Sequence, residues 1–148
     1  MRRHKPLFLF PVLFLLYLNI ACGREKNEAI SENLEQNSSI VKGEVLVTHN
    51  LDLDFTAHLV TFIELGADKC IPCKAMQPIM KEIAEEYVGK IQVVFYDVWK
   101  DPRPARHYRI QLIPTQVFID SNGKEIFRHV GLFPKDEILD MLKEKEIL

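Results

Sequence analysis

Residues 70–73 read Cys70-Ile71-Pro72-Cys73, and this stretch decides how the rest of the chain is interpreted. An apolar, strand-like run ends just before it, and a segment with helical periodicity begins at it. Pro72 favours the first turn of a helix, where its missing N–H is not needed. Cys70 then lies at the helix N-terminus, whose partial positive charge favours a thiolate over a thiol. Lys74 adds a positive charge in the same sense, so we predict a reactive dithiol here.

The composition is that of a globular protein with one core. The chain has 148 residues, of which 47% are hydrophobic and 27% charged, and this length favours a single domain. The formal net charge is −2. A nucleic-acid-binding protein would carry a basic surface, so we expect no nucleic-acid partner.

The first 22 residues have the layout of an export signal. The basic residues Arg2, Arg3 and Lys5 precede an almost wholly apolar run, Leu7–Leu18, which is short for a membrane span. We therefore expect residues 1–22 to direct the chain out of the cytoplasm. A cleaved secretory signal and an uncleaved N-terminal anchor are both compatible with this pattern.

Ala21-Cys22 at the end of that run resembles the lipobox of bacterial lipoproteins, although Asn19 stands where leucine is usual. The resemblance implies that Cys22 is lipidated and that the chain is anchored to a bacterial membrane, on the periplasmic side in a Gram-negative cell. An exported protein with three cysteines would otherwise keep an odd thiol. With Cys22 lipidated, the two remaining cysteines form the redox pair.

The chain after Cys22 divides into two parts. Residues 23–43 are polar and lack apolar periodicity, so we expect a flexible tether. Residues 44–148 have the pattern of a folded domain. Its expected strands are a short one at Val45–Val47, two buried ones at His58–Leu65 and Ile91–Val98, and a hairpin of Gln116–Asp120 with Lys124–Val130.

Three helices are expected between these strands. The first begins at the cysteine pair, has Pro78 in its interior and ends before Gly89. Its apolar stripe recurs at intervals of three and four residues: Cys73, Met76, Met80, Ile83, Ala84 and Tyr87. This places the second cysteine in the core and leaves Cys70 accessible. A short irregular helix is expected within Asp101–Arg109 and an amphipathic one at Asp136–Lys145.

Residues 44–148 resemble the thioredoxin superfamily. Apart from the cysteine pair, the resemblance rests on Lys74, on Pro78 at the position of the family's helix kink, on Ile113-Pro114-Thr115 as the cis-proline loop, and on Val130-Gly131 after the hairpin. It implies an α/β thioredoxin fold, with a central mixed β-sheet flanked by helices on both faces. It also implies a cis Pro114 opposite the cysteines, beside backbone that can pair with an extended substrate.

Together with the expected export signal, the resemblance implies an extracytoplasmic thiol–disulfide oxidoreductase that reduces protein disulfides. Cys70 would attack the substrate and Cys73 would resolve the mixed disulfide, supported by Ile71, Pro72, Lys74, Ile113 and Pro114. We expect no cofactor, a monomeric chain, and recharging by a membrane thiol–disulfide transporter.

Two other functions share this sequence pattern. The same residues would serve a thiol oxidase that donates its disulfide, and they would also fit a metal-delivery protein. Zinc would need two further ligands, and His49, His58, His107 and His129 show no paired spacing. We therefore predict no metal site.

Some positions depart from the family pattern. Lys69 and Ile71 replace its tryptophan and glycine, and Phe95 stands where a lysine often pairs with a buried aspartate. That aspartate aligns with either Thr61 or Glu64. We consider Glu64 as a proton relay for Cys73, with a solvated carboxylate at a strand end as the other interpretation. Trp99 and Tyr96 are expected in the core or at its edge.

Overall fold

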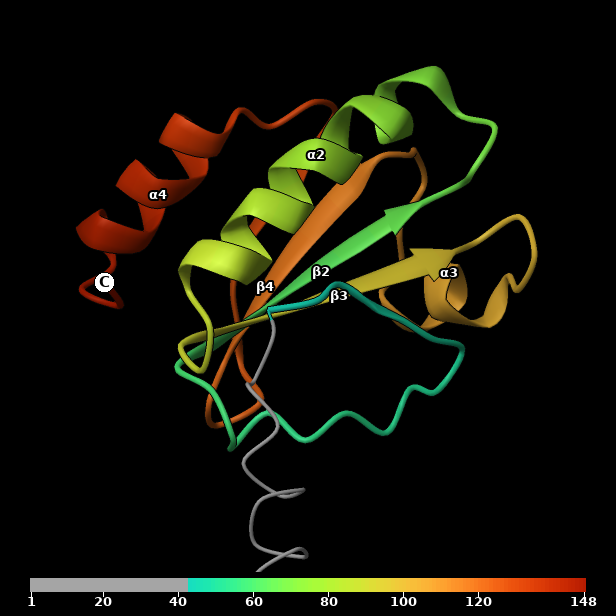
Figure 1. Ribbon diagram of the computed structural model, residues 1–148. Coiled ribbons are helices and arrows are strands. Elements are labelled where there is room, and N and C mark those ends of the chain that lie inside the picture. The colour runs from blue at the N-terminus through green and yellow to red at the C-terminus, as the bar shows by residue number, and fades with distance from the viewer. Residues whose placement is uncertain (1–42) are drawn as a thin grey trace, which may run out of the picture. The chain divides into compact units, whose positions relative to one another are not determined.

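The computed structural model of the protein describes residues 43–148 (Figure 1). The expectations for the export signal, for lipidated Cys22 and for the tether up to residue 42 lie outside these residues. Within the described part of the chain, no helix is both long and apolar enough to cross a membrane.

Five strands form one mixed sheet in the order β1-β3-β2-β4-β5. β1 (Leu46–Val47) and β2 (Val60–Gly66) both run parallel to β3 (Ile91–Asp97). β4 (Thr115–Asp120) is antiparallel to β2 and forms a hairpin with β5 (Glu125–Val130). All of β2 is buried, as its run of β-branched and aromatic residues predicts for a central strand.

Helices cover both faces of this sheet, which confirms the predicted fold class. α2 (Ile71–Glu86) and α4 (Lys135–Glu144) lie on one face, and α3 (Arg103–His107) lies on the other (Figure 1). Alternate residues of β2 supply the two cores: Phe62 packs with the α2 and α4 side chains, and Ile63 packs on the α3 side. The irregular segment before β2 covers part of the second face through Leu51, Leu53 and Phe55.

The predicted apolar stripe holds α2 against the sheet. Its buried side chains are Cys73, Met76, Met80, Ile83 and Ala84. Burying each of the larger ones contributes about 1.5–3 kcal/mol, so packing of this stripe is the main force that fixes the helix. α2 continues through Pro78 to Glu86, and the backbone of Gly89 then adopts a φ of +74° in the turn towards β3.

The expectation that Trp99 belongs to the core or its edge is wrong, because the residue is 62% exposed. β3 ends at Asp97, and Trp99 lies in the turn that follows, where its backbone N–H donates to the Asp97 carboxylate at 3.1 Å. Tyr96, the last residue but one of the strand, is fully buried as predicted, and its hydroxyl donates to the carbonyl of Asn50.

Candidate active site

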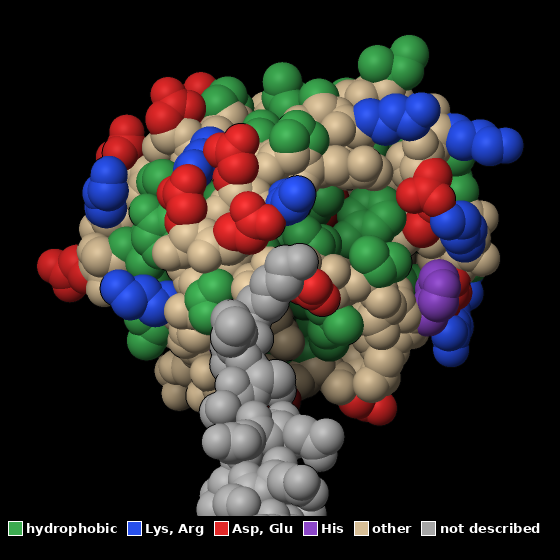
Figure 2. Space-filling model, viewed as in Figure 1, with side chains coloured by type: hydrophobic (Ala, Val, Ile, Leu, Met, Phe, Trp, Pro, Cys, Tyr) green, Lys and Arg blue, Asp and Glu red, His purple; other side chains and the backbone are tan. Residues whose placement is uncertain are grey.

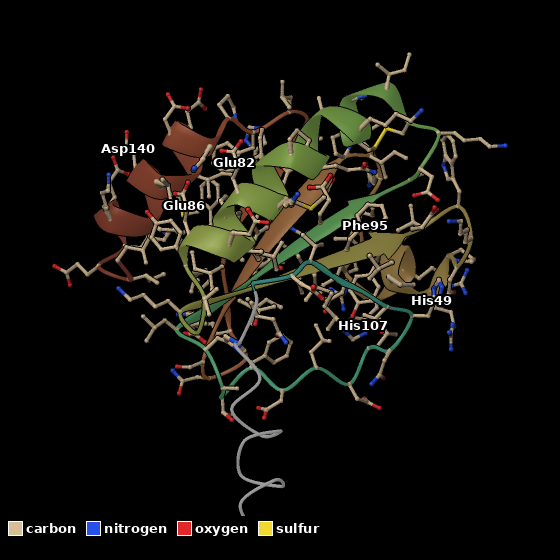
Figure 3. The ribbon with its side chains drawn as sticks, viewed as in Figure 1. His49, Glu82, Glu86, Phe95, His107 and Asp140 are labelled. Atoms are coloured by element: carbon tan, nitrogen blue, oxygen red, sulfur yellow. A yellow bond between two sulfur atoms is a disulfide. The ribbon has the colours of Figure 1, made fainter. Side chains whose placement is uncertain are left out.

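The cysteine pair lies at the start of α2, where Figure 3 shows its disulfide as a yellow bond. Cys70 is the N-cap residue, with an extended backbone, and Pro72 occupies the first turn as its sequence position predicts. The Sγ of Cys70 accepts a hydrogen bond from the backbone N–H of Cys73 at 3.3 Å. A sulfur at this place receives both a backbone donor and the positive end of the helix dipole, which together stabilise a thiolate.

The two sulfurs differ in their access to solvent. Cys73 is fully buried and Cys70 is 8% exposed, so the predicted contrast is present but Cys70 is more enclosed than expected. Ile71, between them, is 82% exposed. The side chain next to Cys70 in the chain is therefore apolar and open to a target molecule.

Gly66 allows the sulfur of Cys73 to pack closely against the sheet. A Cβ added at Gly66, the last residue of β2, would lie 3.2 Å from Cys73 Cβ, 3.3 Å from Cys73 Sγ and 3.1 Å from the Phe95 ring. These separations are tighter than ordinary side-chain contacts. The end of β2 therefore approaches Cys73 as closely as it does because residue 66 has no side chain.

Phe95 occupies the position opposite Glu64 in the parallel pairing of β2 with β3. Its ring lines a hollow of about 360 Å³ together with Val45, Val47 and Met80. Hydrophobic side chains are visible in a hollow of the face shown in Figure 2, and Phe95 is labelled in Figure 3. An aromatic ring, and not an ammonium group, therefore neighbours the buried carboxyl from β3.

The charged side chains around Cys70 favour a negative charge on its sulfur. Lys69 and Lys74 are exposed on either side of the pair. Asp68, which by itself would oppose a thiolate, forms an ion pair with the Lys100 ammonium, and Lys100 also lies 3.3 Å from Asp97. The acid nearest to Cys70 in sequence is thus compensated, and the surrounding field favours the thiolate.

Asp97 holds the turn that carries Lys100. Burial alone would raise the pKa of this carboxyl. The backbone N–H groups of Asp68, Lys100 and Trp99 and the Lys100 ammonium outweigh that effect and hold its pKa below the usual value. Asp97 is therefore a structural anchor that stays ionised, and it fixes the loop before the cysteine pair to the loop after β3.

The Ile113–Pro114 peptide bond is cis, which confirms the predicted backbone conformation. Ile113 packs against the small cluster formed by Ala67, Cys70 and Cys73, so this loop lies beside the disulfide. The Pro114 carbonyl accepts from the N–H of Gly131 at 2.9 Å. The predicted cis-proline loop is thus bonded to Gly131, which follows the hairpin.

Glu64 is fully buried, so the interpretation of a solvated strand-end carboxylate is wrong. It lies on the same face of β2 as Gly66 and Phe62, which is the face that α2 covers, whereas the hydroxyl of Thr61 points elsewhere and bonds Gln92. Burial raises the pKa of the Glu64 carboxyl from 4.5 to about 8, although a hydrogen bond from Gln116 acts in the opposite direction. Of the two aligned candidates, only Glu64 is an acid on the Cys73 side of the sheet.

Gln116 is a site residue that sequence analysis missed. It faces Glu64 directly in the antiparallel pairing of β2 with β4, and its Nε2 donates to Glu64 Oε2 at 2.9 Å. One signal could have revealed it: in an apolar strand, Gln116 shares the inward face with Phe118. A polar residue at such a position needs a buried partner.

No group of three or more His, Cys, Asp or Glu side chains close enough to hold a metal ion occurs within residues 43–148. The histidines of this domain do not converge on the cysteine pair in a common ligand set. The metal-delivery alternative therefore gains no support from the described residues.

Comparisons with known proteins agree with this geometry. Residues 42–144 match the family model "Thioredoxin". Thioredoxin from Staphylococcus aureus is 31% identical over 94 residues, which cover 62% of this chain and 89% of that protein. The chain therefore belongs to the thioredoxin family. Together with the paired cysteines, this membership supports a thiol–disulfide oxidoreductase.

Solved structures show the same fold. Chloroplastic thioredoxin z is 25% identical with a TM-score of 0.61, covering 70% of this chain and 95% of that one. Thioredoxin from Malassezia sympodialis is 25% identical with a TM-score of 0.59, covering 71% and 93%. A mutant thioredoxin from Halobacterium salinarum NRC-1 is 24% identical with a TM-score of 0.63, covering 72% and 95%. Each of these likenesses spans nearly the whole of the other protein, so the shared fold is that of a complete thioredoxin domain.

Proposed function

We propose that this protein is an extracytoplasmic protein-disulfide reductase that works through the Cys70–Cys73 couple. One observation carries the proposal: the Cys70 sulfur caps the start of α2 and is bonded to a fully buried Cys73. This arrangement pairs the more accessible sulfur, as nucleophile, with a resolving thiol held within bonding distance. Ile113 packs against the pair, and its cis bond to Pro114 follows, where substrate backbone would approach.

In the reduced protein, the Cys70 thiolate attacks one sulfur of a substrate disulfide. The substrate S–S bond breaks, a mixed disulfide forms, and the first substrate sulfur leaves as a thiolate that takes a proton from water. Cys73 then loses its proton to the Glu64 carboxylate, and its thiolate attacks Cys70 Sγ. The second substrate sulfur leaves and is protonated in turn. The substrate gains two electrons and two protons, and Cys70–Cys73 becomes a disulfide.

Exposed apolar side chains around the pair support a peptide substrate. Leu112, Val130 and Leu132 belong to the loops on either side of Pro114, and each is about half exposed or more. Ile71 directly follows Cys70, and Leu112 precedes Ile113, which packs on the cysteine pair. Exposed apolar side chains on these loops suit an extended or partly unfolded segment better than a small charged disulfide.

The proposal places the domain outside the cytoplasm through lipidated Cys22, with a membrane thiol–disulfide transporter as electron donor and with no bound cofactor. It treats the chain as a monomer. Export and lipidation are supported by the sequence of residues 1–22. Labelling with a fatty-acid probe in the expressing cell should fail for Cys22→Ser, and labelling that persists in this variant would reject the lipid anchor.

Disulfide donation is the second candidate function. Lys69 and Lys74 favour it, because cations that stabilise the Cys70 thiolate also make the disulfide form a stronger oxidant. The reduction potential of the couple decides between the two. A value near about −270 mV supports a reductase, and one near about −120 mV supports a disulfide donor.

The assignment of the two thiols is tested by a pair of serine variants of the full-length protein. Cys73→Ser should accumulate mixed disulfides with its substrates through Cys70, because the resolving thiol is gone. Cys70→Ser should lose exchange activity altogether, and Cys22→Ser in detergent serves as the control for an unrelated cysteine. Reduction of insulin disulfides by Cys70→Ser at the parent rate would show that Cys70 is not the nucleophile.

A further inference from the structure

Gln116 is a buried polar side chain that the exchange steps above do not use. It is fully enclosed, like Glu64 opposite it. Its Nε2 donates to Glu64 Oε2 at 2.9 Å and to the Gly131 carbonyl at 3.0 Å. Both amide hydrogens of Gln116 therefore have an acceptor. One is the Glu64 carboxyl within the sheet, and the other is the carbonyl of Gly131, whose N–H donates to the Pro114 carbonyl.

The Gly131 carbonyl fixes the orientation of this amide. A carbonyl oxygen only accepts hydrogen bonds, so the NH₂ end of Gln116 has to face it. A reversed amide would place Gln116 Oε1 against the Gly131 oxygen and also against Glu64 Oε2. The position of Gln116 Oε1 is therefore determined by its neighbours.

Two oxygens of the pair lack a donor. Glu64 Oε1 and Gln116 Oε1 are both buried without a hydrogen-bond partner among the described residues. An unpaired buried acceptor is unfavourable. A single proton on Glu64 Oε1 provides the missing donor. The resulting O–H group can donate a hydrogen bond to Gln116 Oε1, and Gln116 Nε2 still donates to Glu64 Oε2.

We propose that Gln116 is a positioning residue that pairs with the carboxyl of Glu64 in both of its protonation states. With Glu64 ionised, the amide donates one hydrogen bond to it. With Glu64 protonated, the amide donates one and accepts one, which closes a carboxylic acid–amide pair. A proton that passes from Cys73 to Glu64 is then held between Glu64 Oε1 and Gln116 Oε1, and no electron is transferred in that step. The inference rests on the proposed function, since it takes Glu64 as the acceptor of the Cys73 proton.

Besides Glu64, several titratable groups lie near this face of the sheet; two of them, Asp68 and Lys100, pair with each other and line the hollow beside Phe95. Cys73 comes from α2, and His129 lies opposite Gln116 in the pairing of β4 with β5. His129 stacks on Phe133 and its Nε2 lies 3.2 Å from the Leu132 carbonyl. The remaining neighbours of Glu64 on this face are uncharged: Phe62, Gly66, Phe95 and Phe118. His129→Gln therefore serves as the control for the imidazole opposite Gln116.

Infrared difference spectra of the oxidised full-length protein, recorded as the pH is raised, test the pairing directly. The C=O band of the protonated Glu64 is identified by its loss in Glu64→Gln. We expect this band at the low wavenumber of an acid with two hydrogen bonds in the wild type and in His129→Gln. We expect a shift to higher wavenumber in Gln116→Leu. A wild-type band at the position of an unpaired acid would overturn the proposal even if Gln116→Leu does not fold.

Kinetics give a second readout. In Gln116→Leu the carboxylate form of Glu64 loses one charge-assisted donor, whereas the neutral acid loses one donor and one acceptor. These losses act in opposite directions on the pKa of Glu64, so the pH midpoint of insulin reduction should move by less than about one unit while the rate falls. Wild-type rates in Gln116→Leu at every pH would contradict the positioning role. Glu64→Gln with wild-type rates at every pH would reject Glu64 as a relay, and with it the proposed proton step. The infrared band would still show whether the acid–amide pair exists, so the two failures are distinguishable.

Discussion

Replacing Glu64 by glutamine keeps the size of the side chain and its ability to accept from Gln116, but removes a buried group that titrates. Burial raises the pKa of Glu64 from 4.5 to about 8 in the folded protein. A folded state with the higher pKa binds the proton more tightly than the unfolded chain does, so the free energy of unfolding falls as the pH rises between these two values. The stabilising effect of the neutral acid is complete below pH 4.5 and is lost above about pH 8.

The size of this effect follows from the pKa difference. At about 1.4 kcal/mol for each unit, the stability of the wild type relative to Glu64→Gln should fall by about 5 kcal/mol in total, of which about 4 kcal/mol lies between about pH 5 and about pH 9. Urea unfolding of both oxidised proteins, followed by far-UV circular dichroism from about pH 5 to about pH 9, measures this difference. Glu144→Gln, which removes an exposed carboxylate at the end of α4, is the matched control. Parallel stability curves for the wild type and Glu64→Gln would refute the argument that burial dominates the titration of Glu64.

Two further substitutions test packing around the site. Gly66→Ala should lower the free energy of unfolding by about 1–3 kcal/mol, because the new Cβ would press on Cys73. Equal urea midpoints for variant and wild type would show that α2 can move away from the sheet without loss of stability. Arg128→Met should cost about 1–2 kcal/mol in a thermal unfolding experiment, because the guanidinium binds the Glu125 carboxylate and also donates to the Tyr108 carbonyl at 2.9 Å. A melting temperature that stays within error of the wild type would mean that this link between β5 and the end of α3 contributes nothing.

Local patterns predicted most of the architecture. The three- and four-residue spacing of Met76, Met80 and Ile83 predicted both the helix and its buried side. The β-branched runs predicted β2 and β3 as central strands, and the structure moves their ends by only one or two residues. These features depend on neighbours in the chain, so a sequence contains the information directly.

The relation between Glu64 and Gln116 could not be predicted in the same way. The two residues are 52 positions apart and meet only through the register of β2 and β4. A shift of one residue would have turned Thr61, and not Glu64, towards the α2 side. The prediction that Trp99 belongs to the core or its edge is wrong for a related reason. Its side chain is apolar enough for a core, but β3 ends at Asp97 and Trp99 lies in the turn that follows.

The exposed position of Trp99 has a practical consequence. It is the only tryptophan in the 148 residues. Its side chain lines a hollow together with Asp68 and Lys69, the two residues that directly precede Cys70 in the chain. Its fluorescence therefore originates at the redox end of the domain and from nowhere else in the protein. A substrate that covers this end changes the surroundings of the indole, so docking and release can be timed optically on the unlabelled protein.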